Sequence, residues 1–186
     1  MKTRIPVPHY AEVEHESIRP EFSGSGNEHR ATLRIPFKGA RGNKTLCIIG
    51  QNPSAASKQI ADKTIHYLEK LVHLNFPEYG ELLILNLYSR VDTAKDKLGS
   101  PLDTGCASLF ELAISEHSDF LVVYGKLKNQ RAYKFLERAR AVYPLLRGKN
   151  VMKLDIGTPY APHPGNSKIL YSNFNVGMAA YDFSDL

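Results

Sequence analysis

The chain has 186 residues, which is enough for one well-packed domain and too few for two domains of ordinary size. Its 42% hydrophobic and 23% charged residues are ordinary for a soluble globular protein. No segment approaches the roughly 20 consecutive apolar residues of a transmembrane helix, so we expect no membrane span. The net charge of +5 is modest, and its distribution along the chain is more informative than its size.

Residues 1–17 lack the apolar segment of a secretory signal. The two cysteines, Cys47 and Cys106, provide neither a disulfide framework nor the spacing of metal ligands. We therefore expect a reduced, cytoplasmic protein.

Positive charge is concentrated in residues 126–153. Nine basic residues against the single acid Glu137 give this segment a charge of +8, in a chain whose total is +5. The basic residues are Lys126, Lys128, Arg131, Lys134, Arg138, Arg140, Arg147, Lys149 and Lys153. Such a block suits DNA, because each Lys or Arg near a phosphate releases a condensed counterion. The alternative is an ordinary solvated helix face.

The pattern divides the chain into an N-terminal extension, residues 1–44, and a single α/β domain, residues 45–186. Pro6, Pro8 and Pro20 prevent a long helix in the extension. Residues 31–37 alternate well enough for a strand, and Pro36 favours an edge position for it. We expect this extension to pack on the core.

Short continuous apolar runs predict strands that are buried on both faces, at 45–50, 81–88, 119–125 and 150–157. Apolar residues at helical spacing predict helices between and after them, at 57–74, 102–116, 127–143 and 169–183. Strands that alternate with helices form a parallel sheet with right-handed crossovers. The expected fold is a three-layer α/β/α domain with a central four-stranded parallel sheet.

In such sheets ligands bind just beyond the carboxyl ends of the strands. After the first strand come Gly50, Gln51, Asn52, Pro53 and Ser54, which match neither the Walker loop nor the dinucleotide fingerprint. The proline biases Asn52 to an extended conformation that projects its amide into the cleft, although an Asn there could instead cap a turn. Ser54 could cap the next helix.

Two more candidates follow later strands. Asn86 closes the run Leu82–Leu85, where a partly buried amide must have partners and could bind the edge of a base or tie two loops together. His163 lies between Pro162 and Pro164 in the loop 158–168, and this stiff frame favours a functional role over that of an inert loop histidine.

Four segments in this order resemble the uracil-DNA glycosylase superfamily: GQNPS (50–54), LLILN (82–86), FLVVYG (120–125) and HPGNS (163–167). The chain also resembles a bacterial and phage domain family of unknown function, itself similar to these glycosylases. That family's motifs are matched by Asn52-Pro53-Ser54, Asp62-Lys63-Thr64-Ile65, Asn86-Leu87 and His163-Pro164. The likeness covers about residues 45–175 and implies a glycosylase-like fold.

The resemblance implies a DNA glycosylase that uses no metal and no cofactor and flips a uracil-like, deaminated or modified base into the cleft. Asn52 and His163 would be catalytic: the first positions the attacking water, and the second stabilises the departing base. Asn86 would bind the base edge. Further substrate contacts are implied for Gly50, Gln51, Pro53, Ser54, Tyr88, Pro164, Gly165 and Ser167, and DNA contacts for Lys126, Lys128, Arg131 and Lys168. Bacterial and phage members imply the removal of modified bases from phage DNA in defence.

The chain departs from the superfamily at three points. Asn52 replaces the Asp of the fastest relatives, and an amide cannot accept a proton. The apolar wedge that relatives insert into DNA falls near Ser167, which is small and polar. The aromatic that stacks on the base is not fixed by position, and Phe76, Tyr67 and Tyr88 are all candidates.

Two other functions remain open. A non-catalytic nucleic-acid-binding module would bind DNA in a salt-dependent way without needing His163. An enzyme acting on free nucleosides or nucleotides would tolerate neutralisation of residues 126–153. In each case we expect a monomer.

Overall fold

A computed structural model describes the chain at residues 7–24, 26–40, 42–92, 94 and 99–186. Residues 1–6 of the expected N-terminal extension, with Pro6, lie outside the described part. The strands are β1 (Arg19–Ser23), β2 (His29–Pro36), β3 (Lys44–Gly50), β4 (Tyr79–Asn86), β5 (Asp119–Val122), β6 (Asn150–Leu154) and β7 (Met178–Ala180). The helices are α1 (Lys63–Asn75), α2 (Thr104–Glu116), α3 (Phe135–Val142) and the single-turn α4 (Ser167–Leu170), with 3-10 turns at His15–Ser17 and Tyr143–Leu146.

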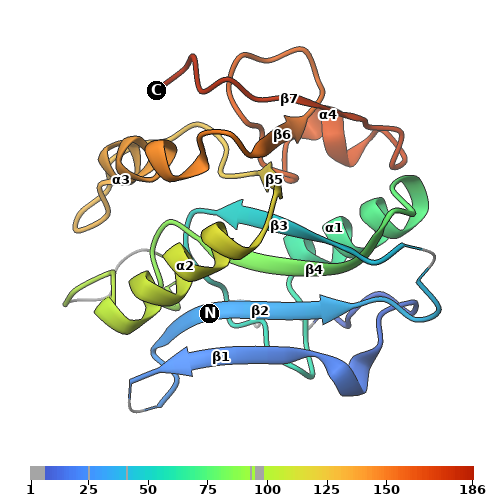
Figure 1. Cartoon of the computed structure of the whole chain (residues 1–186), viewed down its shortest axis with the longest axis horizontal. Coiled ribbons are helices and arrows are strands. Elements are labelled where there is room, and N and C mark those ends of the chain that lie inside the picture. The colour runs from blue at the N-terminus through green and yellow to red at the C-terminus, as the bar shows by residue number, and fades with distance from the viewer. Residues whose placement is uncertain (1–6, 25, 41, 93, 95–98) are drawn as a thin grey trace.

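The strands form one mixed sheet in the order β1-β2-β4-β3-β5-β6-β7 (Figure 1). Its centre, β4-β3-β5-β6, is parallel, and these are the four strands that the apolar runs predict. The prediction of a parallel core is therefore confirmed. The sheet is larger than this parallel centre, because β2, β1 and β7 extend it with antiparallel pairs.

Helices cover both faces of the sheet. On one face, Leu46 and Ile48 of β3 pack in a cluster with α1, and on the other face Cys47 and Ile49 pack with α2 and α3. Successive strand residues point to opposite faces, so a strand covered on both sides is apolar at every position. This explains the continuous apolar runs. None of the helices in the described residues has the length and apolar composition of a membrane span.

The first core helix begins at Lys63, six residues later than the helical spacing predicts. Asp62 is its N-cap, since the side-chain oxygen accepts a hydrogen bond from the backbone N–H of Ile65 at 2.8 Å. The residues before it form turns, in one of which Ser57 N–H donates to the carbonyl of Ile60, and Ala61 bridges to Val7. Ser54, expected to cap this helix, instead accepts a hydrogen bond from Ala56 N–H within a turn.

The expected basic helix 127–143 is reduced to α3, which begins at Phe135. In the segment before it Gln130 and Tyr133 form a bridge, and Arg131 has a φ of 51°. A left-handed residue between two bridged residues makes a tight turn and interrupts a helix. The first four basic residues of the +8 segment are therefore carried by a loop.

The expected closing helix 169–183 is wrong. The helix α4 ends at Leu170, and Asn173 and Phe174 have φ values of 52° and 63°, which no α-helix accommodates. The chain then turns back as β7, whose residues pair with β6.

The expected edge strand is β2, and it lies inside the sheet between β1 and β4. Pro36 is tolerated because it lies two residues beyond Arg34, the last residue of β2 that pairs with β1. Its missing N–H therefore removes no bond from that ladder.

A buried ion pair joins the N-terminal segment to α1. Nδ1 of His9 lies 2.5 Å from Oε1 of Glu69, and both side chains are inaccessible to solvent. The other ring nitrogen bonds the carbonyl of Ser57 at 2.9 Å, and the second carboxylate oxygen accepts from Tyr10 N–H at 2.7 Å. Because both ring nitrogens face oxygen atoms, the protonated imidazole donates a hydrogen bond on each side.

Candidate functional site

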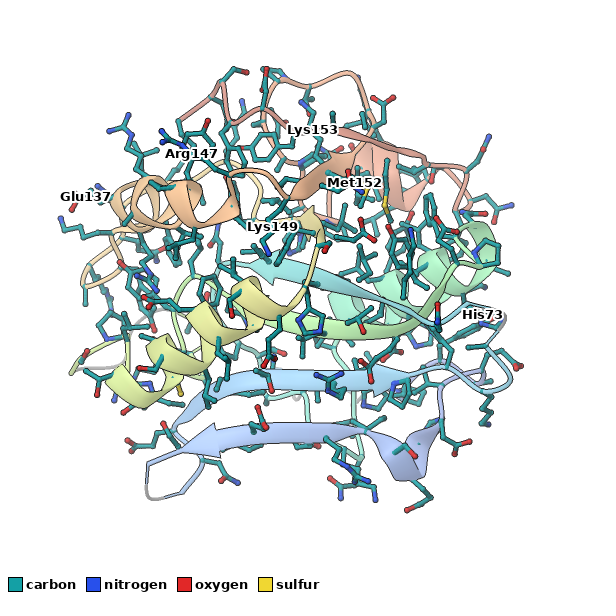
Figure 2. The ribbon with its side chains drawn as sticks, viewed as in Figure 1. His73, Glu137, Arg147, Lys149, Met152 and Lys153 are labelled. Atoms are coloured by element: carbon teal, nitrogen blue, oxygen red, sulfur yellow. The ribbon has the colours of Figure 1, made fainter. Side chains whose placement is uncertain are left out.

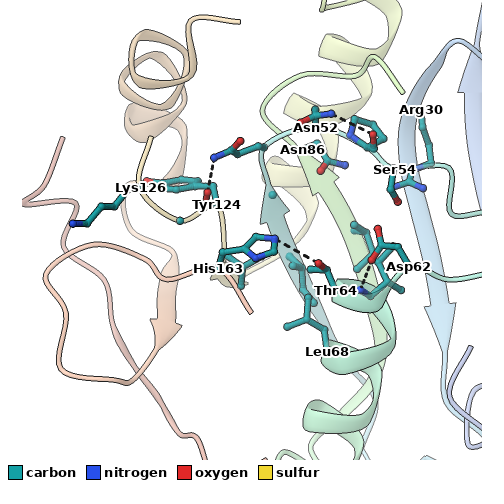
Figure 3. A pocket seen from close by; sticks show the side chains of 18 residues that line it. Arg30, Asn52, Ser54, Asp62, Thr64, Leu68, Asn86, Tyr124, Lys126 and His163 are labelled. Carbon is teal, nitrogen blue, oxygen red and sulfur yellow. Dashed lines mark hydrogen bonds between the residues drawn. The ribbon is translucent and has the colours of Figure 1, made fainter. Parts of the chain in front are cut away.

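A cavity of about 500 Å³ lies at the carboxyl edge of the parallel strands (Figure 3). Its walls come from the ends of β3, β4 and β5, from the start of β2, from α1 with its N-cap, and from the loop after β6. The lining residues are Arg30, Ile48, Gly50, Gln51, Asn52, Pro53, Ser54, Asp62, Thr64, Ile65, Leu68, Ile84, Asn86, Val123, Tyr124, Gly125, Lys126 and His163. From β3 the chain crosses to β4 on one side, and the next connection leads from β4 back past β3 to β5 on the other side. Ligand sites form where the order of the strands reverses in this way.

Asn86 is held beside the last residue of β3. Gly50 and Asn86 pair across the two strands, and any side chain at position 50 would meet the Asn86 amide, because a Cβ there would lie 2.9 Å from Oδ1. The nitrogen Nδ2 of Asn86 is buried and has no hydrogen-bond partner among the described residues. A buried donor without a partner is costly, so this atom is suited to a ligand's acceptor.

The amide of Asn52 is fixed through its nitrogen. Nδ2 donates to the backbone carbonyl of Asp92 at 2.5 Å, and a longer contact of 3.4 Å reaches the carbonyl of Pro53. The other end of the amide, Oδ1, is therefore an acceptor that nearby backbone has already oriented. This arrangement can hold a water molecule through one of its hydrogens.

His163 is exposed on the cavity wall, and its ring is oriented by its own loop. Gly165 N–H donates to Nδ1 at 2.9 Å, so the proton of the neutral ring is on Nε2. Nε2 lies 3.5 Å from Oγ1 of Thr64, across the cavity in Figure 3. Gly125, at φ +72°, leaves room for this ring, because an added Cβ would lie 3.2 Å from the Cβ of His163.

Other residues of the cavity lining frame this centre. Gln51 ties the ends of β3 and β5 together, since Nε2 donates to the carbonyl of Tyr124 at 2.7 Å. The Tyr124 phenol points away into the core and bonds the hydroxyl of Tyr181 at 2.8 Å. Lys126 is exposed, and its ammonium lies 5.1 Å from the ring centre of Tyr160.

Several expected site residues do not line the cavity. Tyr88 is buried against Tyr133 and Phe135, and its hydroxyl accepts from Lys134 N–H at 3.0 Å. The other two stacking candidates, Tyr67 and Phe76, pack in the core on the α1 face. Pro164, Gly165 and Ser167 lie in the His163 loop and at the start of α4, outside the lining. Of these only Gly165 contributes, through its bond to His163.

The +8 segment is divided between structural and exposed residues. Four of its basic side chains donate hydrogen bonds to backbone carbonyls. Arg138 donates to Leu87 and Arg140 to Leu186. Lys149 donates to Ser115 and His117, and Lys153 to Thr158 and Pro159. Figure 2 shows Glu137 on α3, Arg147 after the 3-10 turn that follows α3, and Lys153 on β6. The loop before α3 carries exposed cations: Lys126, which lines the cavity, and Lys128, Arg131 and Lys134. Lys168 is exposed on α4.

Sequence reasoning missed Arg30 as a site residue, and it assigned no role to Asp62 or Thr64, although these belong to a quoted motif. Arg30 is 2% exposed and belongs to β2. Because β2 is antiparallel to β4, the start of β2 lies beside the carboxyl end of β4. In the sequence Arg30 is visible only as a basic residue near the start of a predicted strand. Whether that position lies at the cavity depends on the direction of the strand in the sheet. Among the described residues no cluster of three or more His, Cys, Asp or Glu is placed to hold a metal ion.

A family model described as "Protein of unknown function (DUF1643)" matches residues 34–164, more than half of the chain. The chain belongs to the DUF1643 family. The DUF1643 match contains the four parallel strands with Asn52, Asp62, Asn86 and His163, while Arg30 lies just before it. Membership agrees with the expected family of unknown function, and it does not link the chain to the uracil-DNA glycosylases. No curated protein and no solved structure gives a significant match.

Proposed function

We propose that this protein is a DNA glycosylase, which hydrolyses the bond between C1′ of a deoxyribose and a nucleobase. The observation that carries the proposal is that Asn52, Asn86 and His163, which follow β3, end β4 and lie in the loop after β6, line one cavity of about 500 Å³. Such a volume suits one flat heterocycle and its sugar. A base must leave the duplex to enter it, as in other enzymes that act chemically on bases.

In the proposed reaction Asn52 holds the water. Its Oδ1 accepts one water hydrogen, and the water oxygen forms a bond to C1′. The bond from C1′ to the base nitrogen breaks, and its electron pair stays on the base. The departing base is then an anion, and Nε2–H of His163 donates a hydrogen bond to its oxygen. Donors that are already oriented toward developing charge are worth about 2.7–4 kcal/mol in other enzymes.

Asp62 takes the proton that Asn52 cannot. It is the carboxylate among the described lining residues, and one of its oxygens is occupied as the N-cap of α1. The second oxygen accepts the proton released by the water, which then passes to the nitrogen of the departing base. This balances the reaction without another acid or base.

DNA binding is assigned to the cavity rim. Lys126 lies on the lining, and Lys128, Arg131 and Lys134 are exposed in the same loop. A flipped nucleotide keeps its flanking phosphates outside the cavity, where these cations can neutralise them.

The test incubates the protein with oligonucleotides that contain uracil, other deaminated bases or modified cytosines, followed by alkali. Strand breaks at one base are the expected result, with Asn52→Ala and His163→Ala slower by about 100- to 1000-fold. Asn129→Ala and His73→Ala, outside the lining, are the matched controls. DNA binding without any breaks would instead favour a non-catalytic module. Breaks at equal rates in all variants would reveal a contaminant and remove the support for the enzyme.

A further inference from the structure

Arg30 is an unusual member of the cavity wall because it is charged and buried. It is 2% exposed, and of its three guanidinium nitrogens only Nη1 has an acceptor among the described residues, the carbonyl of Ala56 at 2.7 Å. The buried Nε has no hydrogen-bond partner there. A guanidinium offers five N–H groups, so the described residues use only a small part of its hydrogen-bonding capacity.

The charge of Arg30 is also incompletely neutralised. Asp62 is the carboxylate in the same lining, and its negative charge acts on Arg30, but no ion pair within 4.0 Å joins them in the described chain. Burial lowers the pKa of Arg30 to about 10, with Asp62 opposing the shift, so the group remains a cation at neutral pH. A buried cation without a close anion is costly, and an anionic ligand removes that cost.

The location of Arg30 separates it from the DNA-binding rim. Figure 3 shows Arg30 beside Ser54 and Asp62, while Lys126 lies on the opposite side of the cavity, beyond Tyr124. The second unpartnered buried atom of the lining, Nδ2 of Asn86, is also a donor. The inner wall therefore offers donors and positive charge to whatever enters.

We propose that the inner wall is an anion subsite, in which Arg30 binds an acidic oxygen group of the ligand, either a carboxylate or a phosphate. On the proposed function, on which this inference rests, the group is a carboxylate on a modified base, because only the base reaches that wall. A phosphate would instead indicate a free nucleotide as the ligand. The planar guanidinium matches either group with two parallel hydrogen bonds.

The test measures binding of three probes by calorimetry: 2′-deoxyuridine, its 5-carboxylate and its 5′-monophosphate. We expect one acidic probe to bind the wild-type protein about 10- to 100-fold more tightly than the neutral probe. In Arg30→Gln the preference falls to about twofold or less, whereas Arg34→Gln, on the same strand outside the cavity, keeps it. Lys126→Gln also keeps it, and this variant separates the inner wall from the rim.

The acidic probe that binds more tightly shows where the ligand carries its acidic group. The 5-carboxylate carries it on the base, and the 5′-monophosphate carries it on the sugar. If Arg30→Gln does not fold, NMR of the wild-type protein serves as the test instead, with the guanidinium Nε–H resonance of Arg30 followed as each probe is added. That resonance must shift with the acidic probe and not with 2′-deoxyuridine. Equal affinities for all probes, or a preference that follows Lys126, overturn the proposal. Because no bond is cleaved, the result is independent of whether the protein is a glycosylase.

Discussion

Gly50 and Asn86 face each other at the carboxyl ends of β3 and β4, where a Cβ on Gly50 would lie 2.9 Å from the Asn86 amide oxygen. In Gly50→Ala the Asn86 side chain must turn away, because a side chain rotates more easily than the paired backbone of β3 and β4 moves apart. We expect base excision to fall by about tenfold or more, while the free energy of unfolding changes by less than about 1 kcal/mol. Gly177→Ala, where an added Cβ meets nothing within 4 Å, is the control. Unchanged excision in Gly50→Ala would show that Asn86 does not contact the base.

Asp62 has two proposed roles that one substitution separates. Asn is as good an N-cap as Asp, so Asp62→Asn keeps the bond to Ile65 N–H while it removes the proton acceptor and the negative charge that acts on Arg30. We expect excision about 100- to 10,000-fold slower at nearly wild-type stability. Asp62→Ala should be equally slow and also less stable by about 1 kcal/mol. Rapid excision by Asp62→Asn would contradict the role of Asp62 as a proton acceptor and would support only its role as the N-cap of α1.

The rim cations should control DNA affinity and its salt dependence. In Lys126→Gln/Lys128→Gln we expect weaker DNA binding at every sequence, and a plot of log affinity against log salt that is shallower by about 0.7–0.9 for each lost phosphate contact. Lys38→Gln/Lys44→Gln removes the same charge at the opposite edge of the sheet and should leave the slope unchanged. A uniform loss in both double variants would mean that net charge alone binds DNA.

The buried His9–Glu69 pair makes stability depend on pH. Burial alone lowers the pKa of His9, but the hydrogen bonds to Glu69 and to the Ser57 carbonyl, with the charges of Glu69 and Asp62, raise it above 6.5. The folded state therefore binds the proton more tightly than the unfolded state. Its contribution to stability is fully present below pH 6.5 and is lost as the pH rises through the folded-state pKa.

Urea unfolding across that pH range measures the effect. We expect wild-type protein to lose stability as the pH rises, and His9→Gln/Glu69→Gln to lose less of it. The variant removes both charges together, so that no unpaired buried carboxylate remains. Parallel pH profiles for the two proteins would contradict the assignment of this dependence to His9.

The sequence by itself determined the centre of this protein. Strands covered on both faces must be apolar at every position, and this marked β3, β4, β5 and β6. Their order along the chain, each followed by a crossover, brings their carboxyl ends to one edge. Asn52, Asn86 and His163 were therefore predictable as neighbours, and all three line the cavity.

Only the tertiary structure decided what surrounds that centre. Helical periodicity at 57–62 and 171–183 was overridden by pairing with partners distant in the sequence, Val7 for the first segment and β6 for the second. At 127–134 it was overridden by a local turn, in which Arg131 is left-handed between the bridged residues Gln130 and Tyr133. Tyr88 became core rather than a stacking platform, because its direction depends on how α3 packs. Arg30 entered the site because β2 runs antiparallel to β4. Strand direction is set by pairing across the sheet, and no local pattern around Arg30 encodes it.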